Sequence, residues 1–152
     1  MIRNFRECGP QICDEDIRAV EREIGISLPQ DYRDFLLAQN GGRPEPNAFP
    51  INGLENNPFG TIQVFLGIED AIESCNLDWT YHTFSGRLPD NLIAIARDDC
   101  GDLICLSLYG EDAGSVIFWD RHQEIEEPSY ANVYHVADSF AEFLESIREL
   151  PV

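Results

Sequence analysis

The chain has 152 residues, 43% of them hydrophobic, which suits one folded domain over residues 1–152 and leaves little room for a second. Its 28 acidic residues outnumber ten basic ones, all arginine, and the net charge of -18 disfavours direct binding to nucleic acid or to an anionic membrane. No apolar run approaches the about 20 residues that span a bilayer, and no secretory signal is present, so a cytoplasmic protein is expected.

Two helices are predicted in the first 40 residues. The first runs from Asp14 to Ile24, with Asp14 able to cap its amino end and Gly25 able to take the left-handed conformation that ends it. The second starts at Ser27-Leu28-Pro29, since proline is tolerated in a first turn, and ends at Asn40-Gly41-Gly42. The short connection predicts that the two helices are neighbours.

The next segment is rich in turn-forming residues. Asparagine, glycine and proline dominate from Asn40 to Gly60, so a long irregular connection is expected, with no element longer than a short strand. Helical spacing of apolar residues then predicts a short helix from Ile68 to Cys75. A polar stretch that carries Trp79 and Tyr81 follows it.

The second half has the pattern of strands. Apolar runs at Leu92 to Arg97, Leu103 to Tyr109 and Ser115 to Asp120 are separated by acidic, glycine-containing turns, which predicts an antiparallel meander. A fourth strand is expected at Val133 to Val136, before a last helix from Ser139 to Glu149. The chain is therefore predicted to be α+β, with an antiparallel sheet of about four to six strands and helices from both chain ends on one face. The other face is expected to be partly free.

Patterns of known catalytic and cofactor sites are missing. The chain has no Gly-x-Ser-x-Gly turn, no phosphate loop and no Gly-x-Gly-x-x-Gly. Its five cysteines are an odd number with spacings that do not suit zinc, so free thiols in a reducing compartment are the simplest interpretation. Asp98, Asp99 and Asp102 surround Gly101 without the ligand alternation of a calcium loop, and a tight turn explains them better. We predict no cofactor and no metal.

A catalytic pair would have to be assembled from scattered residues. The candidates are Cys100, Cys105, His122 and Glu124. Cys105 lies mid-strand among apolar residues, where cysteine behaves as a small buried group. Nothing in the sequence places a nucleophile beside a base, so catalysis is not predicted.

Negative charge is concentrated in the second half of the chain. Residues 98–127 hold nine acidic residues against Arg121 alone. Trp119 has apolar neighbours and is expected in the core, whereas Trp79 lies beside acidic residues, as aromatic residues at interfaces do. This distribution favours a basic partner.

The motif Leu28-Pro29-Gln30-Asp31-Tyr32-Arg33-Asp34-Phe35-Leu36, followed by Asn40-Gly41-Gly42, resembles the signature of the SUKH superfamily, which includes the Smi/Knr-type domains. Gly101 to Leu106 and Val116 to His122 resemble the later strand motifs of the same family. The resemblance implies an α+β fold without catalytic activity. It also implies action through protein contacts, as immunity proteins that bind toxins in bacteria or as regulators of cell-wall synthesis in fungi.

We therefore expect a protein-binding module of the immunity branch, because many nuclease toxins are basic and an acidic protein can occupy their surface with fast, steered association. A regulatory or scaffolding adaptor on the same fold is the alternative. The signature residues are expected to specify the fold, so we expect a partner to contact residues outside the signature. The predicted partner-binding residues are Trp79, Tyr81, Asp98, Asp99, Asp102, Glu111, Asp112, Asp120, Glu124, Glu126 and Glu127.

Overall fold

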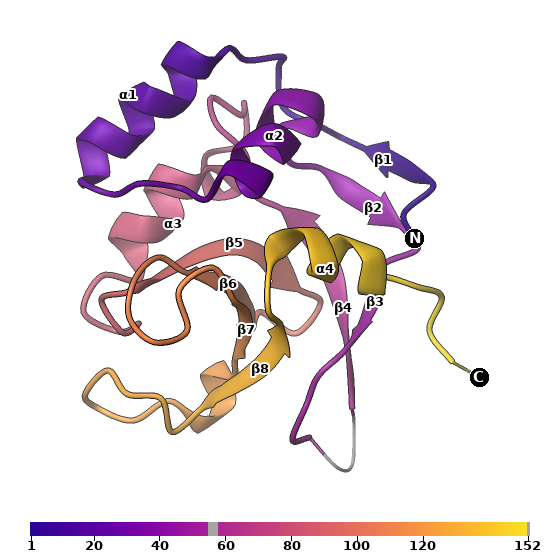
Figure 1. Cartoon of the computed structure of the whole chain (residues 1–152), viewed down its shortest axis with the longest axis vertical. Helices are drawn as coiled ribbons and strands as arrows, with labels where there is room; N and C mark the ends of the chain where they lie inside the picture. The colour runs from indigo at the N-terminus through magenta and orange to yellow at the C-terminus, as the bar shows by residue number, and fades with distance from the viewer. Residues whose placement is uncertain (55–57, 152) are drawn as a thin grey trace.

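In the computed structural model, which describes residues 1–54 and 58–151, six antiparallel strands form a curved sheet in chain order (Figure 1). They are β3 (Ala48–Pro50), β4 (Phe59–Phe65), β5 (Leu92–Asp98), β6 (Leu103–Ser107), β7 (Val116–Trp119) and β8 (Val133–Ala137). The predicted meander is confirmed, and β3 and β4 extend it at its start. A second sheet pairs β1 (Asn4–Arg6) with β2 (Arg43–Glu45).

Both outer strands of the large sheet have backbone partners beyond it. At the β3 edge, Ala48 and Arg148 exchange backbone hydrogen bonds of 3.0 and 2.8 Å. At the β8 edge, the Asn52 N–H donates to the His135 carbonyl oxygen over 3.1 Å. The sheet therefore curves until the chain that follows β3 meets β8.

The two predicted N-terminal helices are confirmed. In α1 (Asp14–Ile24) the cap is Cys13, one residue earlier than expected, and the Asp16 carboxylate accepts the Cys13 backbone N–H over 2.9 Å. Helix α2 (Gln30–Gln39) begins slightly later than predicted, because Pro29 is its N-cap residue and not a residue of its first turn. Among the described residues, no helix combines the length and the apolar character needed to cross a membrane.

Arg33 of α2 ties the two helices together. Its guanidinium forms ion pairs with Asp14 and Glu21 of α1, and the second Glu21 oxygen accepts the Leu28 backbone N–H over 2.7 Å. The hydrogen bond that Arg33 donates to the Glu21 carboxylate raises the pKa of Arg33, although burial opposes this shift. The helices are neighbours, as their short connection predicts.

Helices from both ends of the chain share one face of the sheet, as predicted. The α2 residues Tyr32 and Phe35 pack against Phe140 of α4 (Phe140–Ser146), with ring centroids 5.0 and 5.1 Å apart. The predicted cap Ser139 accepts the Glu142 N–H over 3.1 Å. The helix ends three residues before Glu149 because Arg148 pairs with β3 instead.

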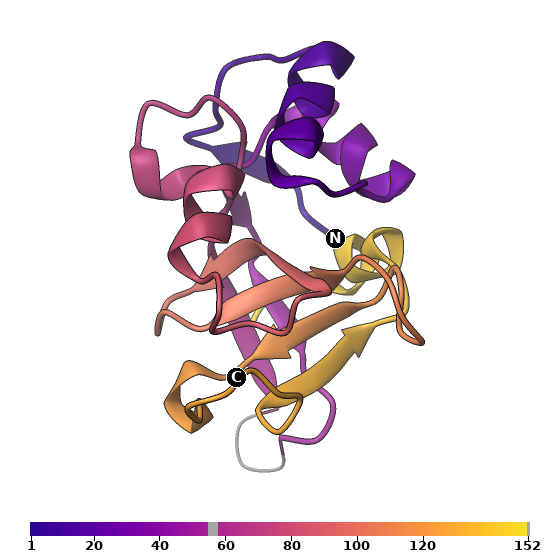
Figure 2. The ribbon, with the colours of Figure 1, turned by 90° about the vertical axis from the view of Figure 1, so that its left-hand side faces the viewer.

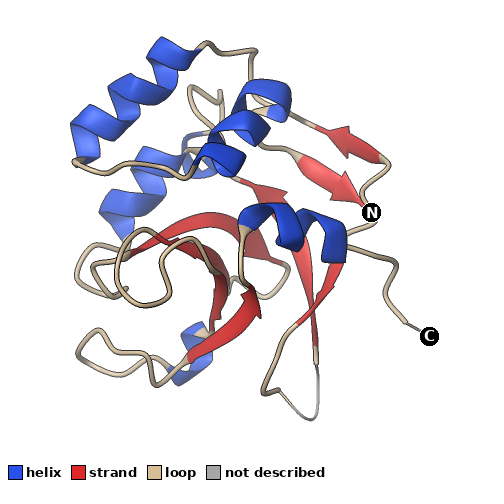
Figure 3. Cartoon of the chain, viewed as in Figure 1, coloured by secondary structure: helices blue, strands red, loops and turns tan. Residues whose placement is uncertain are grey.

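The second face is covered by α3 (Leu77–Thr83), which lies across the sheet from α4 (Figures 2 and 3). Neighbouring β7 residues point to opposite faces. Phe118 contacts Phe49 with centroids 6.5 Å apart, whereas Trp119 contacts Phe84, just after α3, at 5.9 Å. Every residue of β6 and β7 is buried, so the prediction of a partly free face is wrong for these two strands, although alternate residues of β4 (Phe59, Thr61 and Gln63) are partly exposed. Trp119 is in the core, as expected.

The helix predicted from Ile68 to Cys75 is also wrong. That segment contains the 3-10 turn η1 (Glu73–Cys75), and the side chain of Ile72 is 58% exposed. Asn76 holds the segment in place, because its Oδ1 accepts the Asp70 N–H over 2.8 Å and its Nδ2 donates to the Asp70 carbonyl oxygen over 3.1 Å. Such side-chain bonds to backbone compete with helix formation.

Asn40 connects three segments that are distant in sequence. Its buried side-chain Nδ2 donates to the carbonyl oxygens of Pro10 (2.7 Å) and Ile68 (2.9 Å), and its Oδ1 accepts the Ile68 N–H (2.8 Å). A Cβ at Gly9 would come within 2.7 Å of the Asn40 side chain, and one at Gly67 within 2.6 Å of the Asn40 carbonyl oxygen. The N-terminal arm, the end of α2 and the exit from β4 thus meet at one side chain.

Replacing Asn40 is expected to destabilise the whole fold. Asn40→Ala leaves buried backbone groups of Pro10 and Ile68 without partners, so urea unfolding should show a loss of about 3 kcal/mol. Asn40→Gly tests the cause, because glycine suits the left-handed backbone (φ 40) but supplies no hydrogen bonds. Wild-type stability for Asn40→Gly would contradict the hydrogen-bond argument. The exposed control Asn52→Ala should cost less than about 1 kcal/mol.

Candidate functional site

A cavity of about 560 Å³ opens where β5 turns into β6. Its apolar lining is Ile51, Leu54, Phe59 and Phe118, together with Gly53 and Gly60. Its polar lining is Asp98, Cys100, Asp102, Asp120 and His122. Three of the predicted partner-binding carboxylates therefore share one cavity, which we call the acidic cavity.

The tight turn predicted around Gly101 is confirmed, and Asp98 builds it. The Asp98 Oδ1 accepts the backbone N–H groups of Cys100 (2.9 Å) and Asp102 (2.8 Å), and Gly101 adopts φ 86. The pKa of Asp98 is raised to about 6, chiefly by burial and also by the charge of Asp102, although the hydrogen bonds from the backbone N–H groups act in the opposite direction. The turn thus holds a carboxylate whose charge is costly near neutral pH.

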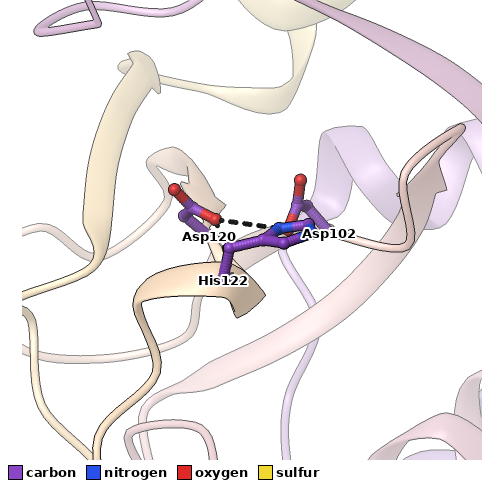
Figure 4. Close-up of side chains that lie close together, drawn as sticks. All are labelled: Asp102, Asp120 and His122. Carbon is purple, nitrogen blue, oxygen red and sulfur yellow. Dashed lines mark hydrogen bonds and ion pairs between the residues drawn. The ribbon is translucent and has the colours of Figure 1, made fainter.

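The end of β7 brings Asp120 and His122 to the same place (Figure 4). Asp120 accepts the His122 backbone N–H over 2.9 Å and so caps the 3-10 turn η2 (Arg121–Gln123). The His122 Nδ1 lies 3.3 Å from an Asp102 oxygen and 3.4 Å from an Asp120 oxygen. Asp102 also accepts the Arg121 backbone N–H over 2.9 Å. The N-cap that Asp120 forms on η2 therefore places Asp120 and His122 together in this cluster.

The cluster has the donor atoms of a metal site without requiring a metal. Ligand atoms of Asp102, Asp120 and His122 all lie within 4.8 Å of one another. Both carboxylates, however, already accept a backbone N–H and contact the imidazole. Hydrogen bonds therefore account for the arrangement.

The cysteines of this region do not resemble nucleophiles. The negative charge of Asp98, with burial and other nearby carboxylates, raises the pKa of the Cys100 thiol, and burial raises the pKa of Cys105. Both shifts disfavour the thiolate on which cysteine nucleophiles depend. The five cysteines, all among the described residues, are free thiols, as predicted from their odd number and spacing.

Other predicted contact residues are engaged in structural bonds. Asp99, beside the acidic cavity, accepts a hydrogen bond from the Thr61 hydroxyl over 2.6 Å. Glu111 and Asp112 follow β6, so they lie at the opposite end of that strand from Asp102. Asp112 accepts from the Tyr130 hydroxyl over 2.8 Å.

Glu124 forms a two-point ion pair with Arg87 (2.9 and 2.7 Å), whose guanidinium lies 4.6 Å from the centre of the Phe84 ring. The hydrogen bond from Arg87 lowers the pKa of Glu124. Glu126 and Glu127 are exposed in the following loop, whereas Trp79 and Tyr81 lie on α3. The structure therefore distributes the predicted set over several places.

Sequence reasoning considered His122 only as a member of a catalytic pair, and it did not predict the apolar lining of this site. The spacing of Asp120 and His122 was a usable signal, because an aspartate two residues before another residue commonly accepts that residue's backbone N–H. Phe59 and Ile51 gave no such signal, since they come from a segment rich in turn-forming residues.

A comparison with protein families identifies the chain. The family model of SMI1/KNR4 (SUKH-1) matches residues 12–146. The chain belongs to the SMI1/KNR4 family. Among curated proteins it is 29% identical over 154 residues to the SPbeta prophage-derived uncharacterized protein YokK of Bacillus subtilis (strain 168), an alignment that covers 91% of this chain and 76% of YokK. The resemblance drawn from the sequence motifs is confirmed.

The SMI1/KNR4 signature residues of this chain lie in structural positions. Pro29 caps α2, Tyr32 and Leu36 are fully buried, and Asn40 makes the bonds described above. These positions support the expectation that the signature specifies the fold rather than the contact surface.

Neutralising Asp98 should stabilise the protein at high pH. Its pKa in the folded state (about 6) exceeds the about 3.9 of an unfolded aspartate, so the folded state binds the extra proton and wild-type stability falls as pH rises between these values. Asp98→Asn keeps an oxygen for both backbone donors, and should gain on the order of 1 kcal/mol at pH 8.

Urea unfolding at pH 4.5, 6 and 8 checks this expectation. The gain should shrink toward pH 4.5, where Asp98 is largely protonated in wild type. Asp99→Asn, on an exposed neighbour, is the matched control and should show no such trend. A destabilisation by Asp98→Asn that is equal at all three pH values would contradict the argument.

Proposed function

We propose that this SMI1/KNR4 family member is a noncatalytic immunity protein that acts in the cytoplasm and neutralises a basic toxin domain, of the nuclease class, through its acidic surface. The observation that carries the proposal is the uneven compensation of charge. At least seven of the ten arginines form ion pairs with carboxylates, and six of these lie in the first 43 residues.

The second half of the chain has few such pairs. Asp99, Glu111, Glu126 and Glu127 have no ion-pair partner among the described residues. A solvated, uncompensated negative surface attracts a cationic partner over a distance and speeds its association. Nuclease domains carry positive charge where they bind phosphate, so such a surface competes with the nucleic acid.

The acidic cavity supports this proposal at short range. Its carboxylates surround an apolar lining, which suits the aliphatic stem and charged end of an arginine or lysine. A cation placed there would also favour the charged form of Asp98, whose buried carboxylate is costly in the free protein. Binding of a cation would therefore offset the free-energy cost of the buried, charged Asp98 carboxylate, which the free protein bears.

The test begins with a pull-down from its own and closely related strains, washed at low and high salt, with bound proteins identified by mass. We expect a basic nuclease domain that is inhibited by the protein and released by salt. Recovery of cell-envelope or housekeeping proteins without a toxin would favour the adaptor function instead.

Charge reversal then tests the surface with the recovered toxin. The triple variant Asp99→Lys, Glu126→Lys, Glu127→Lys reverses exposed charges and leaves the buried Asp98 and Asp102 intact. It should weaken toxin binding by about 100-fold at low salt and flatten the salt dependence. The control triple with the same net charge is Asp34→Lys, Glu145→Lys, Glu149→Lys. Equal affinities for the two triples would show that net charge, not this surface, governs binding.

A further inference from the structure

A second groove, of about 510 Å³, lies between α1 and α3, apart from the acidic cavity. Its apolar lining is Ala19, Val20, Ile68 and Trp79. Its polar lining is Asp16, Glu23, Glu69, Glu73, Asp78, Asn76 and His82. Five carboxylates thus surround an apolar floor, and no arginine lines the groove among the described residues. We call it the α1–α3 groove.

The arginines of α1 do not neutralise this groove. Arg18 pairs with Asp14 over 2.8 Å, and Arg22 pairs with Glu15 over 2.7 Å. Neither arginine lines the groove. Among the described lining residues, the one ionisable base is His82, whose Nε2 lies 3.9 Å from Glu23. The groove therefore keeps a strongly negative field.

Trp79 gives the groove an aromatic wall. Its side chain is 36% exposed, in contrast to Trp119, which is 1% exposed in the core. The Trp79 backbone N–H is bonded to the Asp78 side chain over 2.8 Å, which fixes the start of α3. A partly exposed indole that shares its groove with carboxylates matches arginine, because a guanidinium stacks on aromatic rings and pairs with carboxylates at the same time.

We propose that the α1–α3 groove binds an arginine side chain presented by a basic segment of the protein partner. The inference rests on the proposed function in that the partner is basic. It adds a second attachment point, separate from the acidic cavity, at which a guanidinium contacts carboxylates and the Trp79 ring. The charge complementarity between carboxylates and guanidinium selects this occupant over an apolar or acidic segment.

A peptide probe tests the groove without the natural partner. A capped tetra-arginine peptide is titrated into the ¹⁵N-labelled protein, and the isosteric, neutral tetra-citrulline peptide is the control. We expect a distinct set of chemical-shift changes at the Trp79 indole N–H and at the backbone amides of Ala19, Glu73 and His82, separate from any that the same peptide causes at the acidic cavity. Tetra-citrulline should cause no comparable changes. Changes confined to the acidic cavity around Asp102 and Asp120, or spread evenly over the whole acidic surface, with none concentrated in the groove, would overturn the proposal.

Matched variants separate the local field from net charge. Glu23→Gln, Glu69→Gln, Glu73→Gln neutralises three groove carboxylates and should weaken tetra-arginine binding by about tenfold. Glu126→Gln, Glu127→Gln, Glu142→Gln changes the net charge equally and should leave the groove shifts in place. Trp79→Leu keeps an apolar side chain but removes the ring, and should also weaken binding. Equal affinities for both triples would contradict the groove assignment.

The same variants distinguish this proposal from the proposed function. If the toxin binds tightly and is unaffected by the Glu23, Glu69 and Glu73 substitutions, the groove assignment fails while the immunity function stands. If no toxin is recovered but the arginine peptide maps to the groove, the immunity function fails while the arginine site stands.

Discussion

The fold depends on the buried amide of Asn40, which links three segments that are distant in sequence. One side chain satisfies backbone groups of the N-terminal arm and of the segment that leaves β4, while its own backbone ends α2. Buried backbone groups without partners are costly, so these segments can be close together only while the amide is present. The lack of side chains at Gly9 and Gly67 provides the necessary space. The junction thus fixes the end of α2 relative to the N-terminal arm and to the chain that leads to α3.

Local rules predicted the elements whose stabilising contacts are local. The ends of α1 and α2 follow from proline, asparagine and glycine, and the strands from apolar runs between acidic turns. The position of α3 could not be predicted in this way. The side chain of Asn76 forms hydrogen bonds to the backbone of Asp70, and these bonds favour a loop over a helix in the segment before α3. The spacing of apolar residues gives no information about such bonds.

The candidate site was predictable in its chemistry but not in its grouping. The sequence indicated that acidic turns in the second half would meet a basic partner, and the turn at Asp98 formed as expected. Which carboxylates share a cavity depends on tertiary contacts: Asp120 joins Asp102 through the turn that it caps, whereas Asp112 is separated from them by the length of β6. Glu124 is paired with Arg87, which is distant in sequence and could not be matched to it in advance.

The covered sheet edges restrict how this protein can recognise others. Since Arg148 exchanges two backbone hydrogen bonds with β3 and Asn52 donates one to β8, a partner cannot readily add a strand at these positions. Recognition then relies on side chains displayed by turns, helices and loops. Such residues can be exchanged without altering backbone pairing, so one scaffold can acquire new binding preferences through surface substitutions while its core sequence stays the same.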